Sequence, residues 1–397
     1  MTTNTPARKP PSYDIDREVL ERYGGAADRP EPELCCPSLE YDRSLLDAIP
    51  DEVLAVDFGC GDPSRHARPG ESVLDLGSGS GKACFMISQR VGPSGKVVGV
   101  DMNAKMLALA RRNAPEVARR VGFENVRFVK GHIQDLGLDL EALEDWLSAH
   151  PVTTAEGVAA LEAECVRIRR NRPLIADESI DLVVSNCVLN LVRPEQKAKL
   201  FTEIHRVLER GGRAVISDIV CDEDPTQAIL DDPTLWSGCI AGAFREDRFP
   251  QAFEEAGLYG VEVLARSERP WRVVDGIEFR SMTVRAFKGK EGACLERNQA
   301  VVFRGPWSAV RDDDGHEYPR GARIAVCDKT FNILTNPDGP YAGAFVPVPP
   351  RLGVPLESAT PFACRGTSVR DPRVTKGSEY RLTATNDGTA CTGPECC

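Results

Sequence analysis

From residue 72 onward, short apolar runs alternate with longer stretches in which apolar residues recur at helical spacing. The runs cover residues 72–77, 96–101, 126–131, 179–186 and 211–220. This alternation is typical of strands that cross over through helices into a parallel sheet. Two later segments, residues 260–267 and 279–288, have the pattern of closing strands. The pattern therefore predicts an α/β fold with a doubly wound, seven-stranded sheet that ends near residue 289.

Helical spacing marks the segments around these runs. Residues 194–208 open with a first-turn proline and place Leu200, Ile204 and Val207 on one face, which predicts a helix packed on the sheet. The charged insertion at residues 136–176 has apolar positions that fit helical faces, so we expect two helices there. Residues 1–32 are rich in proline and charge and predict a tail leading into one helix.

A chain of 397 residues exceeds the size that one hydrophobic core usually supports. We expect residues 1–70 to form an amino-terminal tail and a thiol-bearing lid segment, and residues 71–290 to form the sheet domain. Residues 291–385, punctuated by Gly and Pro between strand-like pieces, predict a smaller α+β domain. The polar, Cys-rich residues 386–397 predict a flexible tail.

The charge of the chain limits the classes of partner that we expect. There are 49 basic and 60 acidic residues, a net charge of −11, with no basic stripe. This balance argues against a nucleic acid or an anionic membrane as partner and favours a small substrate. No apolar stretch has the length of a membrane span or the pattern of a secretory signal, which predicts a cytoplasmic protein.

Cysteine is unusually frequent for such a compartment. Fourteen cysteines in a reducing environment do not suggest a framework of disulfides. Paired CxxC knuckles and the HExxH motif are absent, and there are only five histidines, so a conventional zinc site has little support. The thiols therefore need another role.

A glycine-rich loop follows the first predicted strand and indicates a nucleotide-like cofactor. Gly77, Gly79 and Gly81 allow a tight turn and a close approach to a ligand at the start of a helix. Asp101 ends the next strand 101 − 81 = 20 residues later, as expected for a carboxylate that binds ribose hydroxyls. The same spacing suits a nicotinamide dinucleotide. Asp75, two positions before the first glycine, favours S-adenosylmethionine instead, because it can bind the amino group of a methionine moiety.

The remaining cofactor contacts lie at the ends of neighbouring strands. The segment after the third strand is expected to border the adenine. The predicted set is Asp75, Gly77, Ser78, Gly79, Gly81, Asp101, Met102, His132, Ile133 and Asn186.

Three cysteines lie in separate loops that such a fold brings to one edge. Cys187 ends the fourth strand, where doubly wound sheets bind ligands. Cys60 lies in a glycine-rich turn that can fold over the site, and Cys239 follows the fifth strand. Three convergent thiols suit a soft ion that prefers thiolates. A single cysteine is more often core filler, and Cys165, Cys221 and Cys294 are interpreted in that way.

Together these motifs resemble the arsenite methyltransferases of microbes and animals. The likeness rests on residues 58–61, 75–85, 99–107, 185–192 and 236–243, and residues 299–305 and 323–328 resemble the carboxy-terminal domain of microbial members. It implies a class I methyltransferase fold with S-adenosylmethionine as cofactor and trivalent arsenic bound by Cys60, Cys187 and Cys239. It also implies that Cys36 or Cys35 forms a transient disulfide with Cys60, and that thioredoxin or glutathione resets the enzyme.

The resemblance implies methylation of arsenite or its thiol conjugates, with reduction by enzyme thiols between rounds and detoxification as the outcome. Two alternatives stay open: a methyltransferase of an organic small molecule with packing cysteines, and a non-enzymatic metalloid-binding protein. Cys391, Cys396 and Cys397 are either a metalloid-capturing tail or incidental thiols.

Overall fold

A computed structural model describes residues 13–27, 29, 31, 41–56 and 58–377. The chain divides into two compact units, Met1–Gly289 and Lys290–Cys397. Cys35, Cys36 and the terminal Cys391, Cys396 and Cys397 lie outside the described residues. The predictions made for these five cysteines therefore stay predictions.

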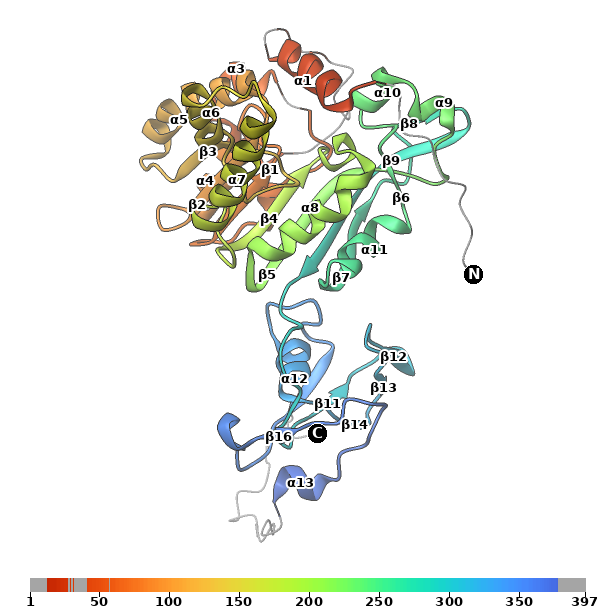
Figure 1. Ribbon diagram of the computed structural model, residues 1–397. Helices are drawn as coiled ribbons and strands as arrows, with labels where there is room; N and C mark the ends of the chain where they lie inside the picture. Colours follow the sequence, from red (N-terminus) through yellow and green to blue (C-terminus); the bar gives the residue numbers. More distant parts are fainter. Residues whose placement is uncertain (1–12, 28, 30, 32–40, 57, 378–397) are drawn as a thin grey trace. The chain divides into compact units, whose positions relative to one another are not determined.

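The first unit is built on one mixed sheet of nine strands (Figure 1). Its main path runs in the order β3 (Val126–Lys130), β2 (Lys96–Asp101), β1 (Ser72–Leu76), β4 (Ile180–Asn186), β5 (Leu208–Cys221), β9 (Ile277–Phe287) and β7 (Tyr259–Arg266). The first five of these strands are parallel, and β9 runs antiparallel to both of its neighbours. The predicted seven strands are confirmed. Two short strands, β6 (Phe244–Arg245) and β8 (Arg272–Val274), add to them.

Helices cover both faces of the sheet because each central strand is apolar on both sides (Figure 1). Val73 packs in a core with α3 (Asp51–Leu54), α4 (Lys82–Val91) and α5 (Ala104–Val121). Its neighbour Leu74 faces the other core, with α8 (Pro194–Val207) and α11 (Arg248–Glu255). The predicted helix behind Pro194 is thus confirmed. The charged insertion forms α6 (Leu140–Ala149) and α7 (Ala155–Asn171), the two helices expected there.

Helix α1 (Ile15–Ala26) is the single helix expected after the amino-terminal tail. It packs against α10 (Pro233–Ser237), with Ile15 and Val19 buried in the same apolar cluster as Trp236. Polar contacts fix the packing: the Tyr13 hydroxyl donates to the carbonyl of Leu230 at 3.1 Å, and Arg193 is ion-paired with Asp14 and Asp16. Short elements α2 (Arg43–Leu46) and η2 (Pro63–His66) connect this region to β1.

The second unit is a small assembly of short strands. Strand β11 (Ala300–Phe303) lies between β14 (Arg323–Ala325) and β15 (Phe345–Val348), with α12 (Asp328–Thr335) packed against it. The described part of this unit also contains β12 (Ala309–Arg311), β13 (Glu317–Pro319), η4 (Leu356–Ser358) and α13 (Pro372–Lys376), and β10 (Leu295–Glu296) pairs with β16 (Thr360–Pro361). Its core is one apolar cluster that includes Val301, Phe303 and Tyr318.

Of the three cysteines interpreted as core filler, Cys221 is buried. The interpretation of Cys294 is wrong, because its side chain is half-buried and its sulfur lies beside those of Cys327 and Cys364. The pairing of β10 with β16 brings these segments together, which no local pattern encodes. Cys165 is half-buried on α7.

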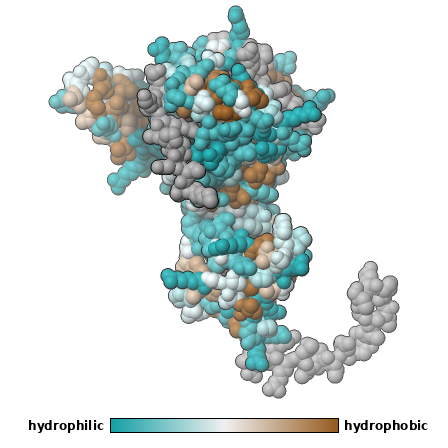
Figure 2. Space-filling view, turned by 90° about the vertical axis from the view of Figure 1, so that its right-hand side faces the viewer, coloured by the Kyte–Doolittle hydropathy of each residue, from teal (hydrophilic) through white to brown (hydrophobic). Residues whose placement is uncertain are grey.

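Among the described residues, no helix has both the length and the apolar character needed to cross a bilayer. On the face shown in Figure 2, hydrophilic residues prevail and hydrophobic residues form separate patches. Exposed apolar side chains include Val166, Trp307 and Leu352, which lie far apart in the sequence.

Candidate functional site

A cavity opens at the carboxyl ends of the central strands, where the strand order reverses between β1 and β4. Doubly wound sheets bind ligands at this switch point, because the loops there leave in opposite directions. Helix α1 closes the cavity with Val19, Leu20 and Tyr23, and Phe58 adds a second aromatic wall. The rings of Tyr23 and Phe58 meet edge to face, with centroids 5.7 Å apart.

The glycine loop after β1 forms one wall of the cavity. Gly77 has a φ of 77°, and a Cβ at that position would lie 2.5 Å from the Val188 side chain. Gly81 has a φ of 87° and caps the start of α4, where a Cβ would lie 2.6 Å from the Phe128 ring. A larger residue at Gly77 would therefore push the loop away from Val188, which also lines the cavity, and one at Gly81 would push it away from β3.

Two carboxyl groups, the buried Asp75 and the half-buried Asp101, flank this loop. Asp101 accepts hydrogen bonds from the backbone N–H groups of Gly79 and Asn103, both at 2.8 Å. Asp75 is 2% exposed and accepts a hydrogen bond from the Cys84 thiol at 3.2 Å. Burial raises the pKa of Asp75 to about 7, although the Cys84 hydrogen bond opposes the rise. An acidic group held in this way is poised to receive a cationic partner.

Most of the predicted cofactor residues line the cavity. They are Asp75, Gly77, Ser78, Gly79, Asp101, Met102, Ile133 and Asn186. Among the described residues that line it, Gly81 and His132 do not appear. The Ser78 hydroxyl is buried without a hydrogen-bond partner within the described chain, which fits a polar ligand in this cavity. The wall contributed by α1 was not predicted, because nothing in its apolar pattern says where the helix docks.

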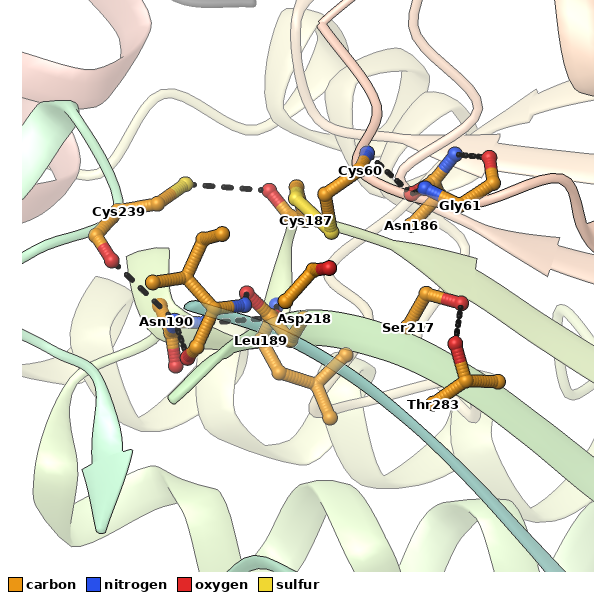
Figure 3. The surroundings of a disulfide bond; sticks show 12 residues. Cys60, Gly61, Asn186, Cys187, Leu189, Asn190, Ser217, Asp218, Cys239 and Thr283 are labelled. Carbon is orange, nitrogen blue, oxygen red and sulfur yellow. Dashed lines mark hydrogen bonds between the residues drawn. A yellow bond between two sulfur atoms is a disulfide. The ribbon is translucent and has the colours of Figure 1, made fainter. Parts of the chain in front are cut away.

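The three predicted cysteines meet in one buried cluster at the edge of this cavity (Figure 3). Their exposed fractions are 5% for Cys60 and 6% for both Cys187 and Cys239. Cys60 and Cys187 form a disulfide with their Cα atoms 5.9 Å apart. The Cys239 thiol points toward Cys187 and donates to its carbonyl oxygen at 3.2 Å. Three separate loops therefore bring their sulfurs to one place, and Cys187 lines the cavity itself.

Two asparagines hold the other two cysteine loops against the end of β4. The Asn186 side chain accepts hydrogen bonds from the N–H groups of Cys60 (2.7 Å) and Gly61 (2.9 Å) and donates to the Gly61 carbonyl at 2.6 Å. Asn190 donates to the carbonyls of Ile219 and Cys239, at 2.6 and 3.2 Å. The segment around Cys187 thus positions the loops of both other cysteines (Figure 3).

Gly59 and Gly61 are needed for this fit. A Cβ on Gly59 would lie 2.2 Å from the Asn186 amide nitrogen, and one on Gly61 would lie 2.3 Å from the Ser217 hydroxyl oxygen. The glycines on both sides of Cys60 therefore let its backbone lie directly on the end of the sheet. This explains the glycine-rich turn noted in the sequence. The side-chain amide of Asn186 is engaged in hydrogen bonds to the Cys60 loop. The prediction that Asn186 is a cofactor ligand did not include this role.

The backbone is strained at two of the three cysteines. Cys187 has a φ of 59° and Cys239 a φ of 61°, in the left-handed region that non-glycine residues rarely adopt. Such a conformation costs on the order of 1–3 kcal/mol and persists where the surrounding structure imposes it. Strain at both positions indicates that the direction of these side chains matters more than local stability.

Two known protein families match the chain. A family described as a methyltransferase domain matches residues 67–257, and one described as a domain of unknown function matches residues 290–380. Together with the strand order, the glycine loop and the paired acidic residues, this defines the class: the chain is a methyltransferase. The class expected from the sequence is thereby confirmed.

Similar proteins show to which family of methyltransferases the chain belongs. An arsenite methyltransferase of Aquipseudomonas alcaligenes is 32% identical over 74% of this chain and 78% of its own length. The human arsenite methyltransferase is 27% identical over 76% of this chain and 73% of its own. The crystal structure of an arsenic(III) S-adenosylmethionine methyltransferase from Chlamydomonas reinhardtii matches 82% of this chain and 98% of its own, with 26% identity and a TM-score of 0.52. The chain belongs to the arsenite methyltransferase family.

Proposed function

We propose that this methyltransferase methylates trivalent arsenic held by the thiolates of Cys60, Cys187 and Cys239. The observation that carries the proposal is the meeting of these sulfurs, from three separate loops, at the wall of the cofactor cavity. Trivalent arsenic is soft and takes three sulfur ligands, and thiolates are the side chains that suit soft ions. Arsenite binds by condensation: three As–O bonds are replaced by three As–S bonds, and three waters leave.

S-adenosylmethionine is the methyl donor. When bound, it supplies a methyl group on a positively charged sulfur, which leaves as a neutral thioether. We assign Asp75 to the amino group of the cofactor and Asp101 to its ribose hydroxyls, because both carboxyl groups line the cavity. The unpartnered Ser78 hydroxyl supplies a further polar contact. Phe58 and Tyr23 exclude water on the opposite side.

The protein contributes mainly by positioning. The nucleophile is the lone pair that arsenic keeps opposite its three sulfurs, so no base has to remove a proton from arsenic. The asparagines that hold the Cys60 and Cys239 loops fix the sulfurs, and the sulfurs fix the direction of the lone pair. Tyr23 lies 3.9 Å from the Cys239 sulfur, and burial raises the pKa of its hydroxyl, which keeps this neighbour neutral.

The disulfide between Cys60 and Cys187 is the oxidised form of the site in this proposal. Two external thiols reduce it, giving two cysteine thiols and one external disulfide. Methylation formally oxidises arsenic from the +3 to the +5 state, and two thiols return it to +3 while they form a disulfide. Cys36 or Cys35 is assigned as the partner of Cys60 in that step. Thioredoxin or glutathione in the cytoplasm supplies the electrons, and detoxification is the outcome.

The test is an assay on the purified full chain with arsenite, S-adenosylmethionine and a thiol reductant, with methylated arsenicals measured by mass spectrometry. Product should form only when reductant is present, because the disulfide blocks two of the three ligands. The matched control is Cys165→Ser, which removes a half-buried thiol on α7, away from the three sulfurs. It should retain full activity. A folded, cofactor-binding sample that makes no methylated arsenic would refute the proposal.

A further inference from the structure

The second unit contains its own group of three thiols. The sulfur atoms of Cys294, Cys327 and Cys364 all lie within 4.8 Å of one another. Cys327 is 1% exposed, whereas Cys294 and Cys364 are half-buried and reachable from solvent. None of the three was among the predicted arsenic ligands. Three sulfurs close enough to share one ion therefore lie in the second unit, on residues other than Cys60, Cys187 and Cys239.

Backbone pairing explains how the group forms. Strands β10 and β16 pair in antiparallel register, and the N–H of Phe362 donates to the carbonyl of Cys294 at 2.8 Å. This pairing carries Cys294 and Cys364 alongside each other. Cys327 is the N-cap of α12, where its sulfur accepts a hydrogen bond from the N–H of Thr330 at 3.4 Å. The positive end of the helix dipole favours a thiolate at that position.

Of the two half-buried thiols, only Cys294 has surroundings that favour ionisation. Although burial opposes ionisation, hydrogen bonds from the thiols of Cys364 and Cys327, and the charge of Lys329, lower the pKa of Cys294. Burial and the hydrogen bond to Cys294 raise the pKa of Cys364. Lys329 lies on the first turn of α12, and its amino group also donates to the carbonyl of Gly292 at 3.1 Å. Thiolate is the form of cysteine that binds soft ions.

The neighbouring histidine indicates the coordination number. His316 would be the usual fourth ligand of a zinc site, but both of its ring nitrogens already have partners. Nδ1 lies 2.9 Å from an Asp312 carboxylate oxygen, and Nε2 lies 3.0 Å from the carbonyl oxygen of Cys364. Among the described residues, the potential ligand group holds the three cysteines and no fourth member. Three sulfurs without a fourth ligand suit a three-coordinate ion better than tetrahedral zinc.

We propose that Cys294, Cys327 and Cys364 form a second site for trivalent arsenic, which binds the ion without methylating it. The choice of ion rests on the proposed function of the first unit, whereas the existence of the site does not. Arsenite enters by condensation with three thiols, so that three As–S bonds form and three waters leave. No electron transfer is involved. The second unit, which matches a domain of unknown function, thereby acquires a role in binding the substrate.

The proposal is tested on the native full chain by alkylation and peptide mapping. Reduced protein is treated with iodoacetamide at increasing arsenite concentration, and the labelling rate of each cysteine is measured by mass spectrometry. At arsenite about ten times above the dissociation constant, Cys294 and Cys364 should label about tenfold more slowly. Cys165 should label at an unchanged rate. No protection of Cys294 and Cys364, or protection confined to the cysteines of residues 386–397, would overturn the proposal.

A second experiment separates this site from the first. The variant with Cys60, Cys187 and Cys239 all changed to Ser should keep arsenite protection of Cys294 and Cys364. If that protection persists while wild-type protein makes no methylated arsenic, the proposed function fails and the second site stands. In the converse case, wild-type protein makes methylated arsenic but arsenite does not protect Cys294 and Cys364, and the second site fails while the proposed function stands. If the site is present, Cys364→Ser should abolish the protection of Cys294, whereas Cys165→Ser should preserve it. Purified protein with one zinc per chain that arsenite does not displace, and that Cys364→Ser releases, would contradict the site.

Discussion

The two thiol groups of this chain differ in how they are held. In the first unit each sulfur comes from a loop at the carboxyl end of a sheet, two of the three residues have left-handed backbone, and asparagine side chains fix two of the loops. In the second unit two of the thiols lie next to the paired strands β10 and β16 and the third on a helix cap, and left-handed backbone is not found at any of the three. In the first arrangement a strained backbone lowers the stability but fixes the direction of the side chains, which a methyl transfer requires. The second needs only proximity, which is enough for binding.

The largest effect expected from this comparison is that of Cys187→Ser. Methylation should fall by more than about a hundredfold, beyond what loss of an outer contact costs a metal site. In the proposed site Cys187 is itself an ion ligand, and the serine hydroxyl is a poor partner for a soft ion. Initial rates of methylated product, measured with reductant present, check this. Arsenite protection of Cys294 should be unchanged in the same variant. Retained turnover would break the comparison, since the strained residue would then be dispensable.

Asn186→Ala should have a smaller effect on the same site. It leaves the N–H groups of Cys60 and Gly61 without their acceptor, so the Cys60 loop loses its fixed position. We expect arsenite binding to weaken by about 10- to 100-fold, as for other residues that orient a ligand. Asn186→Asp keeps an acceptor oxygen for both N–H groups and should recover part of the affinity. Equal losses in both variants would mean that the contact to Cys60 is not what matters.

The hydrogen bonds between Asn186 and the Cys60 loop could not be predicted from the sequence. Strand ends are readable, so the placement of Cys187 and the acidic residues beside the cavity followed from local patterns. The docking of α1 and the hydrogen bond from Asn190 to the Cys239 loop depend on contacts between segments that are distant in the sequence. The same holds for the second thiol group, since Cys294 and Cys364 meet only through the pairing of β10 with β16. Local sequence patterns thus predict the fold and the cofactor loop, but they do not predict the contacts that hold the thiols.

The cofactor side of the first site predicts a pH effect. Asp75 must be ionised to bind a cationic amino group, and burial raises its pKa to about 7. Below that pH the protonated form prevails, so affinity for S-adenosylmethionine should fall about tenfold per pH unit, and above it affinity should level off. Calorimetric titration between about pH 6 and 8 measures this. Asp75→Asn should bind weakly with a flat profile; a flat profile in the wild type would show that Asp75 does not contact the amino group.

The smallest effect concerns a thiol that belongs to neither group. Cys84 is fully buried, and burial together with the charge of Asp75 raises its pKa well above the usual value, which favours the thiol over the thiolate. Its role in our interpretation is to donate to Asp75.

Cys84→Ala removes that donor and should raise the pKa of Asp75 further, which moves the midpoint of cofactor binding upward. The thiol is a weak donor, so its hydrogen bond to the ionised carboxylate is worth about 1 kcal/mol; one pKa unit is about 1.4 kcal/mol, and the midpoint should therefore shift by less than about one pH unit. Cys84→Ser keeps a donor of similar size and should keep the midpoint of the wild type. If the serine variant shifts as far as the alanine variant, packing of the sulfur and not its hydrogen bond sets the acidity of Asp75.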